Sequence, residues 1–72
     1  MMTTADIGKL IRQTRNQQGL RQDELAAASN VGVRFLIELE AGKETAQIGK
    51  ILSVLTALGI ELTLTPSGGM PS

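Results

Sequence analysis

The stretch of residues 22–42 limits the fold more than any other part of the chain. It opens with a short helix-forming run, residues 22–29, whose first turn carries Asp23 and Glu24. Acidic side chains at that place suit the positive end of the helix dipole. Asn30 follows, and Asn is one of the few residues besides Gly that accept a left-handed backbone. These residues predict a short helix that ends at a tight turn.

A second helix is predicted from Val33 until Gly42 stops it, with Val31 between the two helices pointing into the core. At roughly 100° per residue, Leu36 and Leu39 face inward. The opposite side of this helix carries Arg34, Ile37, Glu38 and Ala41. A core has no use for an Arg and a Glu, so this face must meet solvent or a ligand. The major groove of DNA receives a helix face of this kind.

At these residues the chain resembles the lambda-repressor-like (Xre-type) helix-turn-helix DNA-binding domains. The matching residues are Leu20, Gln22, Glu24, Leu25, Ala26, Val31, Leu36, Leu39, Glu40, Gly42 and Lys43. Segments 35–43 and 58–64 more specifically resemble the HipB group of antitoxins. The resemblance implies an all-α fold: a lambda-repressor-like bundle of four to five helices, with one C-terminal β-strand that pairs across a homodimer. It also implies a HipA-like kinase toxin as partner and repression of the protein's own operon.

The chain departs from the family pattern at four positions. Arg21 stands where a helix-capping Thr is usual, and Gly32 where a capping Ser or Thr is usual, so both helix starts are expected to be weaker. Ile37 and Ala41 stand where the family commonly has polar residues. The bases that this helix reads are therefore left open.

The outward face predicts two kinds of contact with double-stranded operator DNA. Arg34 can bond both acceptors of a guanine, Val33 and Ile37 can contact thymine methyl groups, and Glu38 either accepts from a cytosine amino group or orients Arg34. The phosphate contacts are expected from Arg21, Gln22 and Lys43. In a two-fold dimer the recognition helices would enter successive major grooves about 34–36 Å apart, which predicts a pseudo-palindromic operator.

A first helix is predicted to run to about Gln18, with Thr3 or Thr4 as its cap and Gly19 as its stop. Its expected buried face comprises Ile7, Leu10, Ile11 and Thr14. Arg15 lies on the same helix, and charge alone favours a surface position for it. The resemblance implies instead a largely buried, structural ion pair between Arg15 and Glu40.

A further helix is predicted after a cap at Thr45. Its apolar stripe comprises Ile48, Ile51, Leu52, Leu55 and Leu58. Part of this stripe should close the core, and the remainder, together with Val54, should remain available for a partner subunit. Gly49 in this helix costs about 1 kcal/mol relative to Ala unless another backbone comes close.

Residues 60–65 alternate apolar and polar side chains as a half-buried strand does. No second strand is predicted, so we expect this one to pair with its copy in a homodimer through Ile60, Leu62 and Leu64. The expected organisation is a helix-turn-helix domain over residues 1–58, a dimerisation strand over 59–66 and a disordered tail over 67–72. A partner-docking role for Met70 is the alternative to plain disorder in that tail.

Composition bounds the remaining possibilities. Seven basic and seven acidic residues cancel, although the basic side chains Lys9, Arg12, Arg15 and Arg21 share a stretch without acids. The chain has no His and no Cys, which removes the commonest general bases, nucleophiles and zinc ligands. We therefore expect neither an enzyme nor a cofactor or small-molecule ligand. With no leader peptide and no apolar run of about 18 residues, the expected location is the cytoplasm.

Three functions fit these observations. The first is a sequence-specific DNA-binding repressor that is the antitoxin and autoregulator of a HipA-like kinase toxin operon. The second is a stand-alone phage-type or housekeeping repressor, which has the same DNA chemistry without the toxin. The third is a small helical adaptor that uses the fold for protein contacts alone. Binding to the upstream DNA separates the adaptor from the other two, because an adaptor would bind only weakly and without sequence preference.

Overall fold

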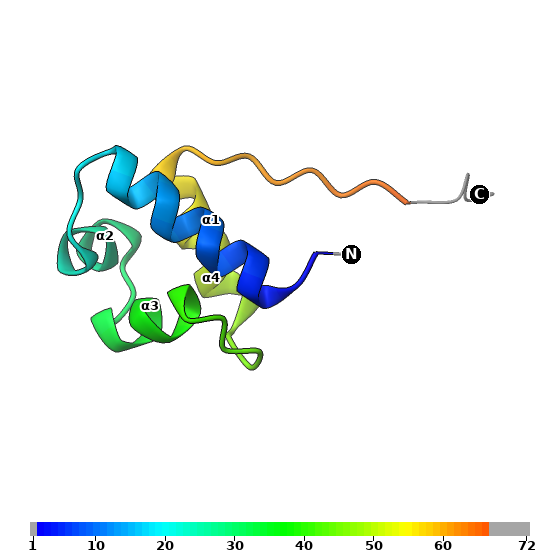
Figure 1. The fold of residues 1–72 in the computed structure, drawn as a ribbon, viewed down its shortest axis with the longest axis horizontal. Helices are drawn as coiled ribbons and strands as arrows, with labels where there is room; N and C mark the ends of the chain where they lie inside the picture. The colour runs from blue at the N-terminus through cyan, green and yellow to red at the C-terminus, as the bar shows by residue number, and fades with distance from the viewer. Residues whose placement is uncertain (1, 67–72) are drawn as a thin grey trace.

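The computed structural model describes residues 2–66, and this part of the chain contains four helices (Figure 1). They are α1 (Thr4–Gln17), α2 (Gln22–Ser29), α3 (Val33–Glu40) and α4 (Ile48–Leu58). Both α1 and α2 pack against α3 and α4. The predicted all-α fold is confirmed, and the helix-turn-helix consists of α2 and α3.

The core is entirely aliphatic. Its buried side chains are Ile11, Leu25, Ala26, Leu36, Leu39, Ile51, Val54, Leu55 and Leu58. Two packing roles expected from the sequence are wrong. Val54 does not face a partner but is fully buried, because it continues the helical stripe of Ile51, Leu55 and Leu58 that faces the core. Leu10 lies at the edge of α1, where it is exposed beside an apolar hollow rather than buried.

Each of the four helices ends in the same backbone arrangement. The residues Gly19, Asn30, Gly42 and Gly59 have φ values of 72°, 58°, 90° and 78°, in the left-handed region. The backbone N–H of each, and that of the following residue, donate to carbonyls in the last turn of the helix. This is the Schellman motif, which satisfies carbonyls that the helix leaves free. The predicted stops at Gly19, Asn30 and Gly42 are confirmed, and Gly59 ends α4 in the same way.

The residue after the left-handed position distinguishes α3 from the other helices. After α1, α2 and α4 this residue is apolar and packs against the core: Leu20, Val31 and Ile60. After α3 it is Lys43, whose backbone N–H donates to the Glu38 carbonyl at 3.0 Å. The end of α3 is therefore anchored through a charged residue instead of an apolar one.

The helix starts are less uniform than the ends. Thr3 caps α1 with a reciprocal pair of bonds: its Oγ1 accepts from the Asp6 N–H at 3.2 Å, and the Asp6 carboxylate accepts from the Thr3 N–H at 2.9 Å. At α2 the Glu24 carboxylate accepts from the Arg21 N–H at 2.8 Å. Gly32, which has no side chain, leaves α3 without a side-chain cap. The expectation of weaker starts at α2 and α3 agrees with this geometry.

The segment between α3 and α4 differs from the prediction. Thr45 does not cap α4, which begins only at Ile48, because Ala46 first turns inward and packs against the core. Gly49, in the first turn of α4, is exposed, and a Cβ placed there would meet no atom within 4 Å. The sequence left open whether another backbone approaches Gly49, and none does among the described residues.

A different glycine supplies the close approach. A Cβ at Gly8 would collide with the backbone carbonyl oxygen of Leu39 and would lie 3.1 Å from the carbonyl carbon of Glu40. Nearby, Thr4 Oγ1 donates to the Gly42 carbonyl oxygen at 3.2 Å. Because the atoms facing Gly8 belong to the main chain, no flexible side chain can move aside. Gly8 therefore allows α1 to lie directly on the last turn of α3.

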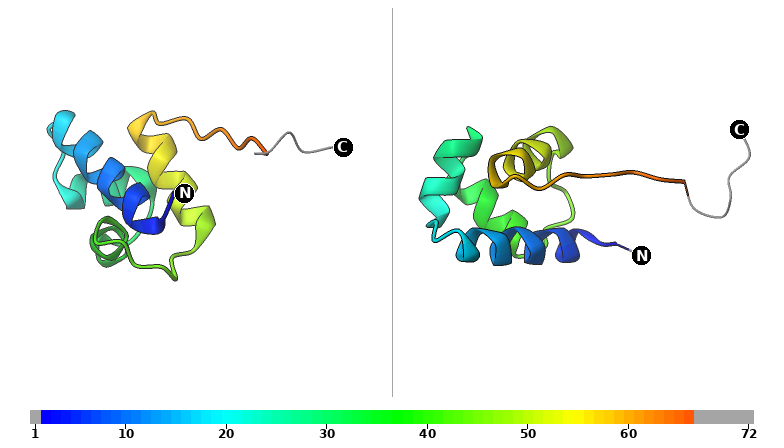
Figure 2. Two further views of the ribbon diagram at one scale, coloured as in Figure 1. Left: turned by 45° about the vertical axis from the view of Figure 1, so that its right-hand side comes forward. Right: turned by 90° about the horizontal axis from the view of Figure 1, so that it is seen from above.

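After α4, residues 60–66 form an extended stretch, which first passes beside α1 and α4 and then leaves the helices (Figure 1). They point to the side of the molecule from which α1 starts (Figure 2). The strand expected at 60–65 is not formed within residues 2–66, because a strand requires a hydrogen-bonding mate and one protomer offers none. The tail expected at 67–72 lies outside the described residues. None of the helices in the described part of the chain combines the length and apolarity needed to cross a membrane.

Candidate nucleic-acid interface

The first turn of α3 exposes two side chains, Val33 and Arg34, on the side away from the core. The left-handed Asn30 turns the chain, and α3 then starts at Val33, which is exposed. Arg34 is the most exposed of these residues, with 91% of its side chain accessible. Ile37, one turn later, is also exposed, although it is a large apolar residue. The residues expected to read bases therefore lie on the surface of α3 opposite Leu36 and Leu39.

Glu38, the fourth residue of that set, contacts two cations. Its carboxylate lies 3.1 Å from Lys43 Nζ and 3.8 Å from Arg34 Nε. The structure thus brings together two residues expected in the base-reading set with one expected to contact phosphate. The Lys43 contact comes from the left-handed turn at Gly42, which directs the chain back alongside α3.

The other two expected phosphate contacts, Arg21 and Gln22, lie at the start of α2. Arg21 is largely exposed, with Nε 3.1 Å from Asp23 and a terminal guanidinium nitrogen 3.9 Å from Glu24. Gln22 is half-buried and donates from its side-chain amide to Glu40 at 3.2 Å. Arg21 is therefore accessible to a ligand, which would compete with Asp23 and Glu24 for it, whereas Gln22 is held against the end of α3.

Glu40 accepts its principal bonds from Arg15 of α1. Arg15 Nε lies 2.7 Å from one carboxylate oxygen, and its second terminal nitrogen lies 3.0 Å from the other. The two side chains are only 10% and 4% exposed. The hydrogen bond to Glu40 raises the pKa of Arg15 above its usual value, against the opposing effect of burial. With Gln22, this pair joins α1, α2 and α3 behind the exposed face.

One basic residue near this face was not expected as a contact. Arg12, which is exposed, lines a surface hollow of about 340 Å³. The other residues of that hollow are Arg15, Gln22, Ile37, Glu40 and Ala41. In the sequence, Arg12 was distinguished only by its place in the acid-free basic stretch. That stretch does not reveal that α1 and α3 lie side by side near Arg12.

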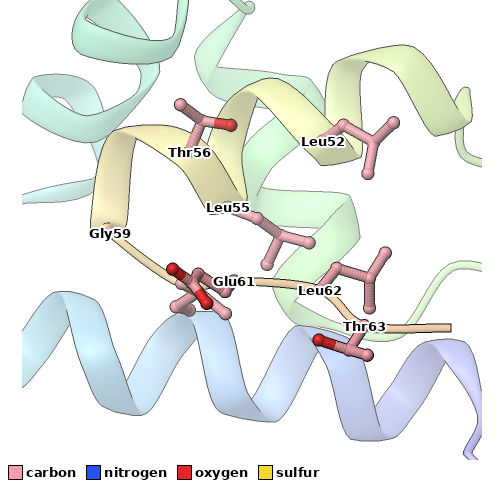
Figure 3. A pocket seen from close by; sticks show the side chains of 8 residues that line it. Leu52, Leu55, Thr56, Gly59, Glu61, Leu62 and Thr63 are labelled. Carbon is pink, nitrogen blue, oxygen red and sulfur yellow. The ribbon is translucent and has the colours of Figure 1, made fainter.

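The three residues expected to close a dimer lie far from this face. Ile60 is half-buried and packs against the core, while Leu62 and Leu64 are exposed along the extended stretch. Figure 3 shows Leu52 and Leu55 of α4 projecting toward the part of that stretch which carries Leu62. An apolar hollow of about 460 Å³ continues from there, bordered by Met2, Leu10 and Ile48.

No group of three acidic side chains that could hold a metal ion occurs within residues 2–66. The exposed face instead presents a guanidinium, an ammonium, a carboxylate and two aliphatic side chains on and beside one helix. Such groups recognise base edges and phosphates through hydrogen bonds and methyl contacts.

Known proteins are similar to this chain in sequence and in fold. The helix-turn-helix family model matches residues 11–64. The uncharacterized HTH-type transcriptional regulator y4mF of Sinorhizobium fredii (strain NBRC 101917 / NGR234) is 56% identical to this chain. The aligned region covers 92% of this chain and 87% of y4mF. A second regulator of that strain, y4dL, is 30% identical over 96% of this chain but only 35% of its own length. A solved structure described as a HipB-O4 20mer complex has the same fold, with a TM-score of 0.83, 18% identity, and coverage of 94% of this chain and 96% of that one. The chain therefore belongs to the helix-turn-helix family of DNA-binding transcriptional regulators, which are not enzymes.

Proposed function

We propose that this chain is a homodimeric, sequence-specific operator-binding repressor of the antitoxin type, which acts in the cytoplasm on its own operon and pairs with a HipA-like kinase. The observation that carries the DNA-reading part is the exposed face of α3. Arg34 is almost fully accessible there, beside the exposed Val33 and Ile37. None of these three side chains contributes to the core, so their chemistry is available to a ligand.

The proposed division of labour follows from chemistry at each position. Arg34 lies in the first turn of α3, where a recognition helix comes closest to the base edges, and it bonds a guanine at two acceptors. Val33 and Ile37 contact thymine methyl groups. Lys43 and Arg21, which flank this face, hold phosphates and fix the docking register.

A mobility-shift assay with the upstream DNA and a scrambled duplex of equal composition tests the proposal. Replacing Arg34 by Ala should weaken operator binding by about 1–3 kcal/mol and relax the preference at one base pair. Replacing Lys43 by Ala removes the same charge, but it should weaken both duplexes without relaxing the preference at any one base pair, and lower the salt slope by up to about one. Binding of the parent to both duplexes with equal affinity would indicate an adaptor. An unchanged affinity ratio in Arg34→Ala would assign base reading to another residue.

The extended stretch motivates the dimer. Leu64 is 83% exposed in the protomer, and Leu62 is exposed beside an apolar hollow. Antiparallel pairing of this stretch with its two-fold copy would supply the missing backbone bonds and cover those side chains. Two α3 helices on one side of such a dimer would fit successive major grooves.

Light scattering tests the dimer. The intact chain should have the mass of a dimer, and replacing both Leu62 and Leu64 by Ser should shift it toward the monomer at micromolar concentration. Replacing Thr63 and Thr65 by Ser changes the alternate side of the same stretch and serves as the control. A double-Leu variant that dimerises as tightly as the parent would show that this stretch is not the contact.

The kinase partner is supported by the resemblance to HipB-type antitoxins and by the fold shared with the HipB complex. We propose that the kinase binds surfaces away from α3, so that toxin and DNA can be held together. Co-purification with the product of the adjacent gene tests this. Absence of a complex at micromolar concentration would place the protein with the stand-alone repressors. Inhibition of the kinase can reside in this chain or in a third protein, and a kinase assay with purified components separates the two.

A further inference from the structure

Glu38 holds two of the three cations that the proposed function assigns to DNA, Arg34 and Lys43. Its carboxylate lies 3.1 Å from Lys43 Nζ and 3.8 Å from Arg34 Nε. The contact with Lys43 is built into the backbone, because the Lys43 N–H also bonds to the Glu38 carbonyl across the Gly42 turn. The three groups therefore form a charge cluster, consisting of Arg34, Glu38 and Lys43, at the end of the exposed face.

This cluster contributes little to folding. Both ion pairs are exposed, with between a third and nine-tenths of each side chain accessible, and pairs of that kind add between nothing and a small amount to stability. The other three helices have an apolar residue at the position of Lys43, and it packs against the core. At α3 the same position carries a charge, which among residues 2–66 is matched by Glu38 alone. The cluster thus departs from the pattern that stabilises the rest of the fold, at the place where DNA is proposed to dock.

We propose that Glu38 is a specificity-determining residue that acts as an internal counter-ion and weakens binding to DNA of the wrong sequence. This inference rests on the proposed function. On random DNA, phosphates must compete with the Glu38 carboxylate for Lys43 and Arg34, and the carboxylate itself repels them. On the operator, a guanine that bonds Arg34 at two acceptors replaces the Glu38 contact. The carboxylate then accepts from a cytosine or adenine amino group, since these are the donors that bases offer in the major groove.

The charge-removing variant Glu38→Gln tests this against a matched control. Glu44 is also an exposed carboxylate, one residue beyond Lys43, and among the described residues it pairs with no cation. Glu44→Gln therefore changes the net charge equally without touching the cluster. At about 0.1 M salt, Glu38→Gln should bind scrambled duplex about 3- to 10-fold more tightly than Glu44→Gln does, and its ratio of operator to scrambled affinity should fall by at least about 3-fold. Equal affinities of the two variants for scrambled DNA would overturn the proposal.

A double-mutant cycle with Lys43→Gln tests whether Glu38 acts through its contact with Lys43 or only through the repulsion between its charge and the DNA phosphates. In the parent, Lys43 is already matched by Glu38, so its removal should weaken scrambled binding less than it does in the Glu38→Gln background. Strictly additive effects would show that Glu38 does not act through Lys43 and would overturn the proposal. Because scrambled DNA suffices for the cycle, its outcome does not depend on operator recognition. A parent that shows no operator preference would refute the proposed function and leave the cycle interpretable.

Discussion

Replacing Arg15 by Met should destabilise the fold more than any surface change, because it leaves a buried charge without its main partner. Met resembles the apolar stem of Arg15, but it is shorter, carries no charge and cannot donate. Glu40, only 4% exposed, would lose two bonds of 2.7 and 3.0 Å. From the side chains of the described residues it would retain the 3.2 Å contact with Gln22. The Leu20 carbonyl would also lose its 2.9 Å bond from Arg15.

The magnitude follows from the burial of both partners. Breaking a buried pair by removing one member costs about 3–5 kcal/mol. A core of this size supplies about 3–5 kcal/mol. The variant should therefore lower Tm by at least about 12 °C and be partly unfolded at room temperature. The pKa of Arg15 is raised, so its contribution is present throughout the neutral range and is lost only at strongly alkaline pH, as pH rises through the folded-state pKa. The cost should be equal at pH 6 and pH 9.

Thermal and urea unfolding followed by circular dichroism measure this cost. The matched variant combines Arg15→Met with Glu40→Leu, which removes both charges and fills the site with apolar atoms. It should recover at least half of the lost stability, since replacing a whole buried pair is often neutral. A loss below about 1 kcal/mol in the single variant, or no recovery in the double variant, would refute the reasoning.

Three further predictions concern single backbone positions and are read from urea midpoints. Asn30→Ala should lower the free energy of unfolding by about 1 kcal/mol, because Ala is strained at φ 58°, whereas Asn30→Gly should be tolerated; equal stability of the two variants would argue against a left-handed turn. Gly49→Ala should raise stability by about 0.5–1 kcal/mol, since its Cβ meets open space, and a loss would reveal a contact at that surface. Thr3→Ala should cost about 1 kcal/mol by removing the α1 cap, and Thr3→Ser should restore it; a silent Thr3→Ala would mean that the first turn frays in solution.

Most helix boundaries could be predicted because they depend on neighbours in the chain. The stops at Gly19, Asn30, Gly42 and Gly59 follow from which residues accept a left-handed backbone, and the inward positions of α3 follow from its period. The start of α4 could not be predicted in the same way. Thr45 has the right chemistry for a cap, but the packing of Ala46 against distant residues decides where the helix begins.

The candidate site was less predictable for the same reason. The exposed residues of α3 follow from its period, whereas the pairing of Arg15 with Glu40 was expected only from the family resemblance. The contact between Glu38 and Lys43 has no sequence signature, because five residues do not correspond to a helical neighbour. It exists because a Schellman turn folds Lys43 back beside the helix. Pairing of residues 60–65 depends on a second copy, so neither one sequence nor one protomer decides it.

Because of the contact at Gly8, the residues that fix the orientation of α3 differ from the residues that would contact bases. The last turn of α3 lies on α1 main chain against main chain, so no rotamer at that contact can alter the tilt of α3. The side chains that would face bases, such as Val33, Arg34 and Ile37, are exposed and take no part in holding the helix. Substitutions among them can therefore change the preferred operator while the angle of approach stays constant. A lineage carrying this scaffold could acquire new target sequences one side chain at a time, without a compensating change in the core.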